Sequence, residues 1–341
     1  MRYRQIEAAA AAVALLLGSA SAVPAVAADY NWTFQSSAQS GDPFYPIQQE
    51  WGEKIGEASG GRIAIEVLPV NAVVQYNETL EAAGAGILTG HLTDPSYVAG
   101  KDPAFAVIGN LVAAWGHPFE MREFLEEGGG YEVYRELLEQ YNLHLIGAAW
   151  TGLEAFVSKV PIRGVDDLRG VKIRAPEGLV QEVFAAAGAT PVNLPASEVY
   201  TSLERGVVDA ADYSVFSANH ALGFHQFARY PNYPGFHSMP VVEVAMNLDE
   251  WNALPDDLKE IVTAETRQLS TDMVEQLEAL DQEAVEEAKA QGVEIIDWPE
   301  EERVKFRQIA QEQWAKWAGQ SEIAQRWYDT VTAYLEEQGK L

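Results

Sequence analysis

Cysteine is absent from the 341-residue sequence. This absence excludes a disulfide framework, a thiol nucleophile and a cysteine-ligated metal, and it argues against a lipid-anchored lipoprotein. Stability must therefore come from the apolar core alone. The 48% hydrophobic composition can supply a large core, and the length of the chain favours two lobes over one.

Basic residues are scarce. The sequence has 23 Lys+Arg against 51 Asp+Glu, which gives a formal net charge of -28 at pH 7. Nucleic acid is therefore excluded as a partner. The same charge repels an anionic small molecule at long range, but screening over about 10 Å at physiological salt lets one local arginine dominate inside a cleft.

Long apolar runs are also missing. The apolar run over residues 8–17 is about half the length that spans a bilayer. It follows Arg2 and Arg4 and precedes the small-x-small pattern of Ala25-Val26-Ala27. These features predict a secretory signal peptide over residues 1–27 and a mature protein exported to the periplasm.

Enzyme signatures are missing too. The sequence has no G-x-S-x-G elbow, no P-loop, no G-x-G-x-x-G after a predicted strand and no H-E-x-x-H, and its six histidines never fall at the i, i+4 spacing of a helical zinc pair. We therefore expect a protein that is not an enzyme. A secreted hydrolase or lyase that uses Glu154 or Asp212 as a base stays the alternative.

The chain alternates between short strands and helices, which predicts an α/β fold with mostly parallel sheets. We expect lobe I over residues 28–150, with later segments returning to it, and the core of lobe II over 151–247. A long bridging helix of roughly 35 residues follows within 248–292, because apolar residues keep helical spacing from Pro255 to Gly292. A strand and helices should fill 293–341, and the protein should be a monomer or a homodimer through these helices.

An arginine at the end of a strand is the most informative single feature. Residues 171–174 form a predicted strand that ends in Arg174, is closed by Pro176 and precedes a helix over 179–187. A sheet holds such an arginine rigidly, and its planar fork of donors matches both oxygens of a carboxylate. Arg174 is therefore our candidate for binding an organic acid.

Other polar and aromatic residues also fall at strand ends or in the loops between strands. In open α/β sheets, ligands bind outside the carboxyl ends of the strands. A mostly apolar pocket with a few convergent polar groups is the usual design of a small-molecule site. The predicted pocket residues are Trp150, Glu154, Phe156, Arg174, Asn193, Asp212, Tyr213, His237 and Ser238.

Five ordered motifs resemble one family closely. They are DDLRGVKIR at 166–174, GATPV at 188–192, EVYTSLERGVVDA at 198–210, GKDPAF at 100–105 and YPGFH at 233–237. In these motifs the chain resembles the periplasmic solute-binding subunit of tripartite ATP-independent periplasmic (TRAP) transporters, the DctP family. The resemblance covers the whole mature chain. It implies a two-lobed periplasmic binding protein (type II-like) with a long lobe-bridging helix and a helical C-terminus, which closes around an organic acid and delivers it to TRAP permease membrane subunits.

The resemblance also implies roles for single residues. Arg174 matches the carboxylate-clamping arginine, and Asn193 matches a polar pocket residue. Asp212 and Tyr213 match an acidic-aromatic pair, whose acidic member helps to hold a cation in the 2-oxo acid branch. A binding protein linked to a sensor in place of a permease has the same fold and chemistry, and the sequence does not separate the two.

The chain departs from the family pattern at two places. Where the 2-oxo acid branch has a further acidic cation ligand, this chain has Phe236, His237, Ser238 and Met239. Where many dicarboxylate binders have an arginine, it has Glu154. We therefore expect no cofactor. We also expect a ligand with one carboxylate, which is either an acid with an aromatic or apolar body or a 2-oxo or 2-hydroxy acid. If sodium or calcium is bound, Asp212 and Glu154 are its candidate ligands. The residues expected around the ligand, beside Arg174, are Trp150, Phe156, Tyr213, Phe236 and His237.

Overall fold

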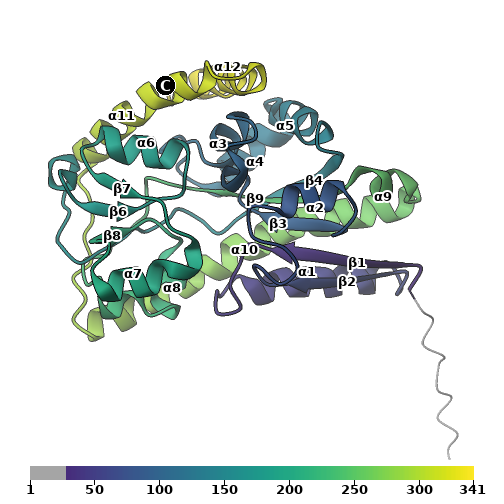
Figure 1. Ribbon diagram of the computed structural model, residues 1–341, viewed down its shortest axis with the longest axis horizontal. Helices are drawn as coiled ribbons and strands as arrows, with labels where there is room; N and C mark the ends of the chain where they lie inside the picture. The colour runs from purple at the N-terminus through teal and green to yellow at the C-terminus, as the bar shows by residue number, and fades with distance from the viewer. Residues whose placement is uncertain (1–27) are drawn as a thin grey trace, which may run out of the picture.

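The computed structural model describes residues 28–341, and it has two lobes, each built on one open sheet (Figure 1). The predicted signal peptide, residues 1–27, lies outside the described residues. The α/β class and the two-lobed architecture are confirmed. The exact residue ranges of the lobes stay a prediction.

The first lobe contains a five-stranded sheet in the order β2-β1-β3-β9-β4. Strands β1, β2 and β3 are parallel, whereas β9 runs antiparallel to both β3 and β4. All seven residues of β9 are buried, so this strand is the centre of the lobe. The strands are β1 (Tyr30–Ser36), β2 (Ile63–Leu68), β3 (Gly90–Thr93), β4 (Leu143–Trp150) and β9 (Val241–Asn247).

Strand β9 corrects one expectation. We assigned residues 151–247 to the core of lobe II, but the chain returns to the first lobe at Val241. Strand β9 contains the charged residue Glu243, and partners inside the lobe allow this residue to be buried. Glu243 is 1% exposed and has two partners, since His91 Nε2 lies 2.6 Å from its Oε1 and Tyr134 donates to its Oε2 at 2.5 Å. A buried carboxylate needs such partners.

The second lobe contains a four-stranded sheet in the order β5-β8-β6-β7. Strand β6 pairs in parallel with β7 and β8, and β5 is the antiparallel edge. Helix α6 lies on one side of this sheet, and α7 and α8 lie on the other (Figure 1). The elements are β5 (Val157–Ser158), β6 (Lys172–Arg174), α6 (Leu179–Ala186), β7 (Thr190–Val192), α7 (Val199–Arg205), β8 (Ala210–Ala211) and α8 (Phe216–Ala221).

Helices of the first lobe pack with their apolar faces on its sheet. In α1, Ile47, Trp51 and Ile55 recur at helical spacing and are buried. Trp51 also donates from Nε1 to Thr266 Oγ1 at 3.1 Å, which ties α1 to the long helix α10. The helices are α1 (Tyr45–Ala58), α2 (Thr79–Gly84), α3 (Ala104–Gly109), α4 (Pro118–Glu127), α5 (Gly130–Glu139) and α9 (Leu248–Ala253).

The long helix α10 (Asp256–Ala290) has 35 residues and confirms the predicted bridging helix. It packs on β4 and α1 of the first lobe and on α8 of the second lobe. Asp256 and Asp257 occupy its first turn and Lys289 its last, which suits the helix dipole.

The C-terminal segment differs from the expectation in one way. The strand predicted at the start of 293–341 is wrong, because the only β-pairing of residues 293–298 is the isolated bridge between Ile296 and Asn232. The predicted helices are α11 (Glu300–Ala318) and α12 (Glu322–Glu337), and Ser321 caps the start of α12 by accepting from the backbone N–H of Ala324. Helix α11 packs on α6 and α3, and α12 packs on α3 and α5, so the pair lies across both lobes.

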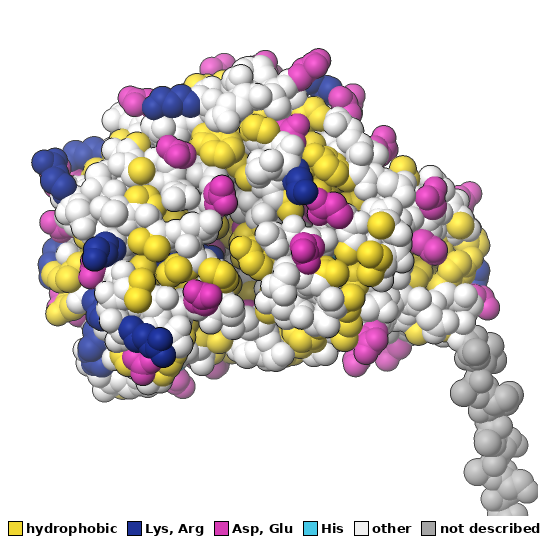
Figure 2. Space-filling model, viewed as in Figure 1, with side chains coloured by type: hydrophobic (Ala, Val, Ile, Leu, Met, Phe, Trp, Pro, Cys, Tyr) yellow, Lys and Arg dark blue, Asp and Glu magenta, His cyan; other side chains and the backbone are white. Residues whose placement is uncertain are grey.

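The surface carries charge unevenly. In the view of Figure 2, Asp and Glu side chains are spread over both lobes, whereas Lys and Arg gather mostly over the lobe of the four-stranded sheet. Among the helices of residues 28–341, none is long and apolar enough to cross a membrane.

Gly90 tests the packing of the central sheet. A Cβ at this position would meet the carbonyl oxygen of Ala245 on β9 and the ring of Phe34 on β1. We expect Gly90→Ala to lower the free energy of unfolding by about 1–3 kcal/mol, because a packed core does not absorb the added methyl group. Gly100→Ala is the matched control, since nothing lies within 4 Å of its Cβ, and it should change stability by less than about 0.5 kcal/mol. Urea unfolding measures both variants, and equal effects would contradict the predicted packing.

Candidate functional site

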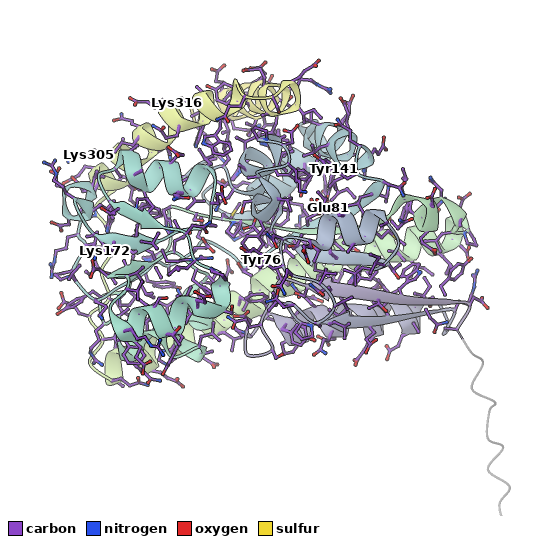
Figure 3. All side chains as sticks on the ribbon, in the orientation of Figure 1. Tyr76, Glu81, Tyr141, Lys172, Lys305 and Lys316 are labelled. Atoms are coloured by element: carbon purple, nitrogen blue, oxygen red, sulfur yellow. The ribbon has the colours of Figure 1, made fainter. Side chains whose placement is uncertain are left out.

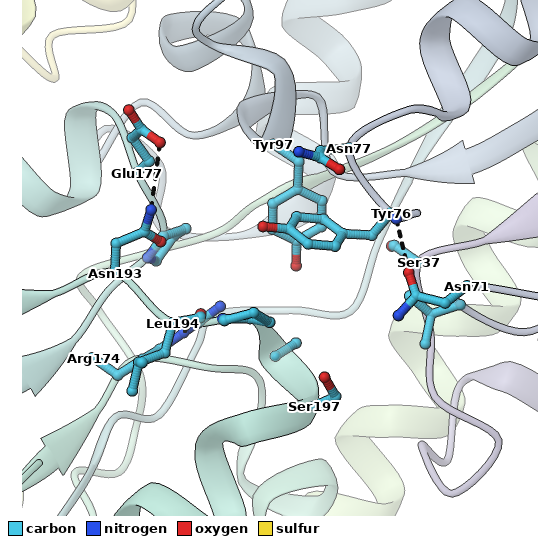
Figure 4. Close-up of a pocket in the computed structure, with 14 residues that line it drawn as sticks. Ser37, Asn71, Tyr76, Asn77, Tyr97, Arg174, Glu177, Asn193, Leu194 and Ser197 are labelled. Carbon is cyan, nitrogen blue, oxygen red and sulfur yellow. Dashed lines mark hydrogen bonds between the residues drawn. The ribbon is translucent and has the colours of Figure 1, made fainter. Parts of the chain in front are cut away.

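A cleft between the two lobes contains two adjoining pockets of about 610 and 650 Å³, measured with their open mouths. Ser37 and Tyr97 come from the first lobe, and Arg174, Pro176 and Ala196 come from the second; all five line both pockets. Figure 4 shows Tyr76 and Tyr97 facing Arg174 and Asn193 across this cleft. The two pockets therefore form one site between the lobes.

Arg174 is the last residue of β6 and is only 3% exposed. Its Nε donates to the carbonyl oxygen of Leu194 at 3.1 Å, and its Nη1 donates to the carbonyl oxygen of Asp212 at 2.5 Å. These contacts hold the guanidinium in one orientation. Since they use two of its five N–H donors, donors remain for a ligand.

The wall opposite Arg174 is built from the segment after β3. Tyr97 lies in the short 3₁₀ helix Pro95–Val98, and its ring meets the Tyr76 ring edge-on at 5.0 Å between centroids. Asp94 caps this helix, since its Oδ1 accepts from the backbone N–H of Ser96 at 2.8 Å. Burial raises the pKa of Asp94 from 3.8 to about 7.

Two extended segments, 151–156 and 236–240, join the lobes at the base of the cleft. The backbone N–H of Glu154 donates to the carbonyl oxygen of Ser238 at 2.8 Å, so the segments lie side by side. Ser238 Oγ accepts from Asn110 Nδ2 at 2.6 Å and donates to Glu154 Oε2 at 2.5 Å. The second oxygen of Glu154 is therefore the one available to Asp212.

Glu154 and Asp212 share one negative charge. Burial raises the pKa of Glu154 well above its usual value, and the neighbouring Asp212 raises it further. Burial also acts to raise the pKa of Asp212, but the hydrogen bond and charge of His237 outweigh it and the net direction is downwards. His237 Nε2 lies 2.6 Å from Asp212 Oδ1. These directions place the proton of the pair on Glu154 and the negative charge on Asp212.

Glu154, Asp212 and His237 are the described residues that could hold a cation, since their ligand atoms lie within 4.8 Å of one another. The donor set does not suit sodium or calcium. Hard cations prefer several oxygen ligands, whereas one Asp212 oxygen is bonded to His237 and one Glu154 oxygen to Ser238. These bonds leave one oxygen of each carboxylate, fewer than a hard cation prefers.

Tyr213 connects the two lobes beside this network. Its hydroxyl accepts from Gln39 Nε2 at 2.7 Å and donates to Asp42 Oδ1 at 3.2 Å. Burial raises the pKa of Asp42 from 3.8 to about 6. Because Gln39 and Asp42 follow β1 and Tyr213 follows β8, these bonds cross from one lobe to the other.

Five of the residues predicted from sequence line the cleft: Glu154, Arg174, Asn193, Asp212 and Tyr213. Asn193 Nδ2 bonds to Glu177 at 3.4 Å at the rim. His237 and Ser238 lie behind the cleft wall, where they contact Asp212 and Glu154.

The prediction of aromatic residues around the ligand needs correction. Trp150 and Phe156 are at most 1% exposed and lie in the main hydrophobic core. Phe236 packs on Trp298 and borders a separate cavity with Trp115 and Arg303. None of the three belongs to the described lining of the cleft, because all three pack in or against the main hydrophobic core.

Sequence reasoning missed the residues that the first lobe contributes to the cleft, among them Asp42, Asp94 and Tyr97. A usable signal existed for Asp94, which directly follows β3 and precedes Pro95 at the carboxyl end of a strand. The same strand-end argument that selected Arg174 therefore applies to both lobes.

Comparison with known proteins settles the class. The family model described as "Bacterial extracellular solute-binding protein, family 7" (DctP) matches residues 34–320. The chain belongs to this family. This DctP protein is 28% identical over 287 residues to a monocarboxylate 2-oxoacid-binding periplasmic protein of Nostoc sp., covering 81% of this chain and 77% of the relative.

Two solved structures are informative. A TRAP periplasmic solute-binding protein from Rhodobacter sphaeroides, in an apo open structure, is 51% identical, with 91% of this chain and 99% of that chain covered and a TM-score of 0.76. One from Pseudoalteromonas atlantica with bound sodium and pyruvate is 25% identical, with 90% and 94% covered and a TM-score of 0.80. The DctP chain is thus a TRAP solute-binding protein and not an enzyme, as predicted.

Glu154→Gln tests the shared proton of the site. The folded protein keeps a proton on Glu154 that the unfolded chain releases above its usual pKa of 4.5, so the wild type should lose stability as the pH rises from 4.5 towards the folded pKa. Glutamine does not titrate. We expect both proteins to have the same free energy of unfolding near pH 4. Above pH 4.5, the free energy of unfolding of the wild type should drop below that of Glu154→Gln by up to about 1.4 kcal/mol per pH unit.

Urea unfolding of the empty protein between pH 4 and pH 8 measures this difference. Glu139→Gln, at an exposed position on α5, is the control for the loss of one carboxylate. Parallel curves for the wild type and Glu154→Gln would show that Glu154 is ionised in the folded protein.

Proposed function

We propose that this DctP protein is a periplasmic receptor that captures a small organic acid with one carboxylate, closes its lobes around the acid and delivers it to a TRAP permease. The observation that carries the proposal is the buried guanidinium of Arg174 at the junction of the two pockets. The assignment to the periplasm rests on the family and on the predicted signal peptide.

Arg174 forms no close ion pair with a described residue, although its positive charge acts at longer range on Asp94 and Asp212. Among residues 28–341, no carboxylate oxygen lies within ion-pair distance of its guanidinium; both of its bonds go to backbone carbonyls. A buried cation without a counter-charge is costly, and a carboxylate that accepts two parallel N–H bonds removes that cost. Arg174 is therefore the proposed clamp for the ligand carboxylate.

The cleft favours a single carboxylate. Arg174 is the one Lys or Arg in the described lining of either pocket, so a second carboxylate would find no cation. The sequence predicts that a ligand with an aromatic body is one possibility. In the cleft, such a ligand would contact Tyr76, Tyr97 and Tyr213, and not the other aromatic residues predicted from sequence, which lie in or against the core. A 2-oxo or 2-hydroxy acid has support from the 2-oxoacid-binding relative of Nostoc.

Closure of the lobes has two supports. Tyr213 bonds across the cleft to Gln39 and Asp42. The structure is also more similar to the ligand-bound neighbour at 25% identity than to the open neighbour at 51% identity, which a closed arrangement of the lobes explains. A ligand that contacts both lobes stabilises the closed state by its differential affinity.

Arg174→Ala tests the clamp. The substitution leaves the ligand carboxylate desolvated without a counter-charge, which costs on the order of 2–5 kcal/mol or more. We expect affinity to fall by roughly thirty-fold to several thousand-fold. Arg174→Lys should recover only part of the loss, because one ammonium group cannot form the two-pronged contact. Calorimetry with a carboxylate identified by thermal-shift screening measures the effect.

Arg169→Ala and Lys172→Ala are the matched controls on the same segment. Both side chains are exposed, and Figure 3 shows Lys172 at the outer edge of its lobe, away from Tyr76 in the cleft. Each should change affinity very little. If Arg174→Ala binds within about threefold of the wild type, the clamp is elsewhere.

Removal of cations tests the chemistry of Asp212. Since His237 and a proton on Glu154 take the place of a hard cation, we expect the ligand affinity to stay the same in sodium-free, chelator-treated buffer and in buffer with sodium or calcium. Calorimetry in the two buffers decides this point. Binding that appears only on adding sodium or calcium would place a cation between Asp212 and the ligand.

A further inference from the structure

The charges that line the cleft are unbalanced. Arg174 supplies one positive charge, whereas four carboxyl groups line the same pocket: Asp42, Asp94, Glu154 and Asp212. Burying a carboxylate without a partner is costly, so each of the four needs a proton, a hydrogen-bond donor or a cation. The carboxyl group with the weakest partners within the protein indicates which chemical group the ligand supplies.

Three of the four carboxyl groups are satisfied within the protein. Asp212 bonds to His237, and Glu154 accepts from Ser238 and holds the shared proton. Asp42 accepts from the backbone N–H of Gln39 at 2.7 Å through one oxygen and from the Tyr213 hydroxyl at 3.2 Å through the other.

Asp94 is different. Its Oδ1 caps the 3₁₀ helix by accepting from the backbone N–H of Ser96, and the Ser96 hydroxyl is its further hydrogen-bond partner, so among the described residues both of its donors belong to the turn that it caps. No Lys, Arg or His nitrogen of residues 28–341 lies within 4.0 Å of it. The carboxyl lines the cleft with Arg174 and Tyr97, and burial raises its pKa although the positive charge of Arg174 opposes this rise.

We propose that the ligand of this cleft is a zwitterion, a small 2-amino acid or related carboxylate with a cationic nitrogen, whose carboxylate binds Arg174 and whose cationic group binds Asp94. This inference rests on the proposed function and adds the class of the ligand. The related protein from Pseudoalteromonas atlantica has bound sodium beside pyruvate; here the ligand itself brings the positive charge.

The arrangement also ties the ligand to closure. Arg174 ends β6 in the second lobe, and Asp94 follows β3 in the first. A zwitterion therefore bonds to one lobe through its anionic end and to the other through its cationic end. Both ion pairs form together only when the lobes are closed, so both contribute to the closed state alone.

Matched acids that differ only at carbon 2 test the inference. The 2-amino, 2-hydroxy and 2-oxo acids of three to six carbons, measured by calorimetry in sodium-free, chelator-treated buffer, share size and carboxylate and differ in the charge of one group. For the skeleton that fits best, we expect the amino acid to bind at least tenfold more tightly than its 2-hydroxy and 2-oxo counterparts. Tighter binding of either counterpart in the wild type would overturn the inference.

Asp94→Asn separates the charge from the fold, because asparagine keeps the oxygen that caps the 3₁₀ helix. The variant should lose roughly ten- to a hundredfold in affinity for the amino acid and bind the 2-hydroxy and 2-oxo acids as well as the wild type or better. Asp281→Asn is the control, since Asp281 is also a buried carboxyl that accepts a backbone N–H, from Ser217 at 2.7 Å, but lies outside the cleft lining.

The outcomes distinguish this inference from the proposed function. If Asp94→Asn weakens all three acids equally, or none, Asp94 does not bind a cationic group and the inference is wrong while the carboxylate clamp stands. If no member of any set binds, or if Arg174→Ala binds them as the wild type does, the clamp itself is wrong and the inference falls with it.

Discussion

A single buried guanidinium organises the cleft of this DctP protein. Arg174 ends β6 and is oriented by two backbone carbonyls, of Leu194 and Asp212, which belong to the neighbouring strand ends of the same sheet. Backbone carbonyls carry partial charge only, so they orient the cation without neutralising it. The lobe of the four-stranded sheet therefore presents a positive charge to the cleft, and in the proposed function the ligand carboxylate neutralises it.

At the base of the cleft the excess charge is negative, because several carboxyl groups lie close together. One proton between Glu154 and Asp212, with His237 behind Asp212, reduces the charge of the cluster without a metal ion. The same residues lie in the segments that join the lobes, since Glu154 and Ser238 pair through backbone and side chain. Charge compensation and the connection between the lobes thus depend on one hydrogen-bond network.

The sequence predicted the elements whose signals are local. Helix α10 has a proline at its start, glycine after its end and unbroken apolar spacing, so its 35 residues were readable. Strand β9 could not be recognised, because a fully buried strand shows no alternation of apolar and polar residues. Residues 293–298 do alternate in this way, but they have no partner strand. Arg174 was found at a strand end, whereas the sides to which Trp150, Phe156 and Phe236 point depend on packing that no short pattern records.

The distribution of charge between the lobes explains why a site in so acidic a protein can select an organic acid. The positive group, Arg174, and the negative group, Asp94, belong to different lobes, so separation of the lobes would expose both charges to water, where a charge costs little. In the empty cleft, each charge is offset only in part by the other. A ligand that lacks one of the two charges leaves the other uncompensated in the closed state. Recognition and closure are therefore one event, and the carboxyl groups that crowd the cleft act as a filter against simple anions.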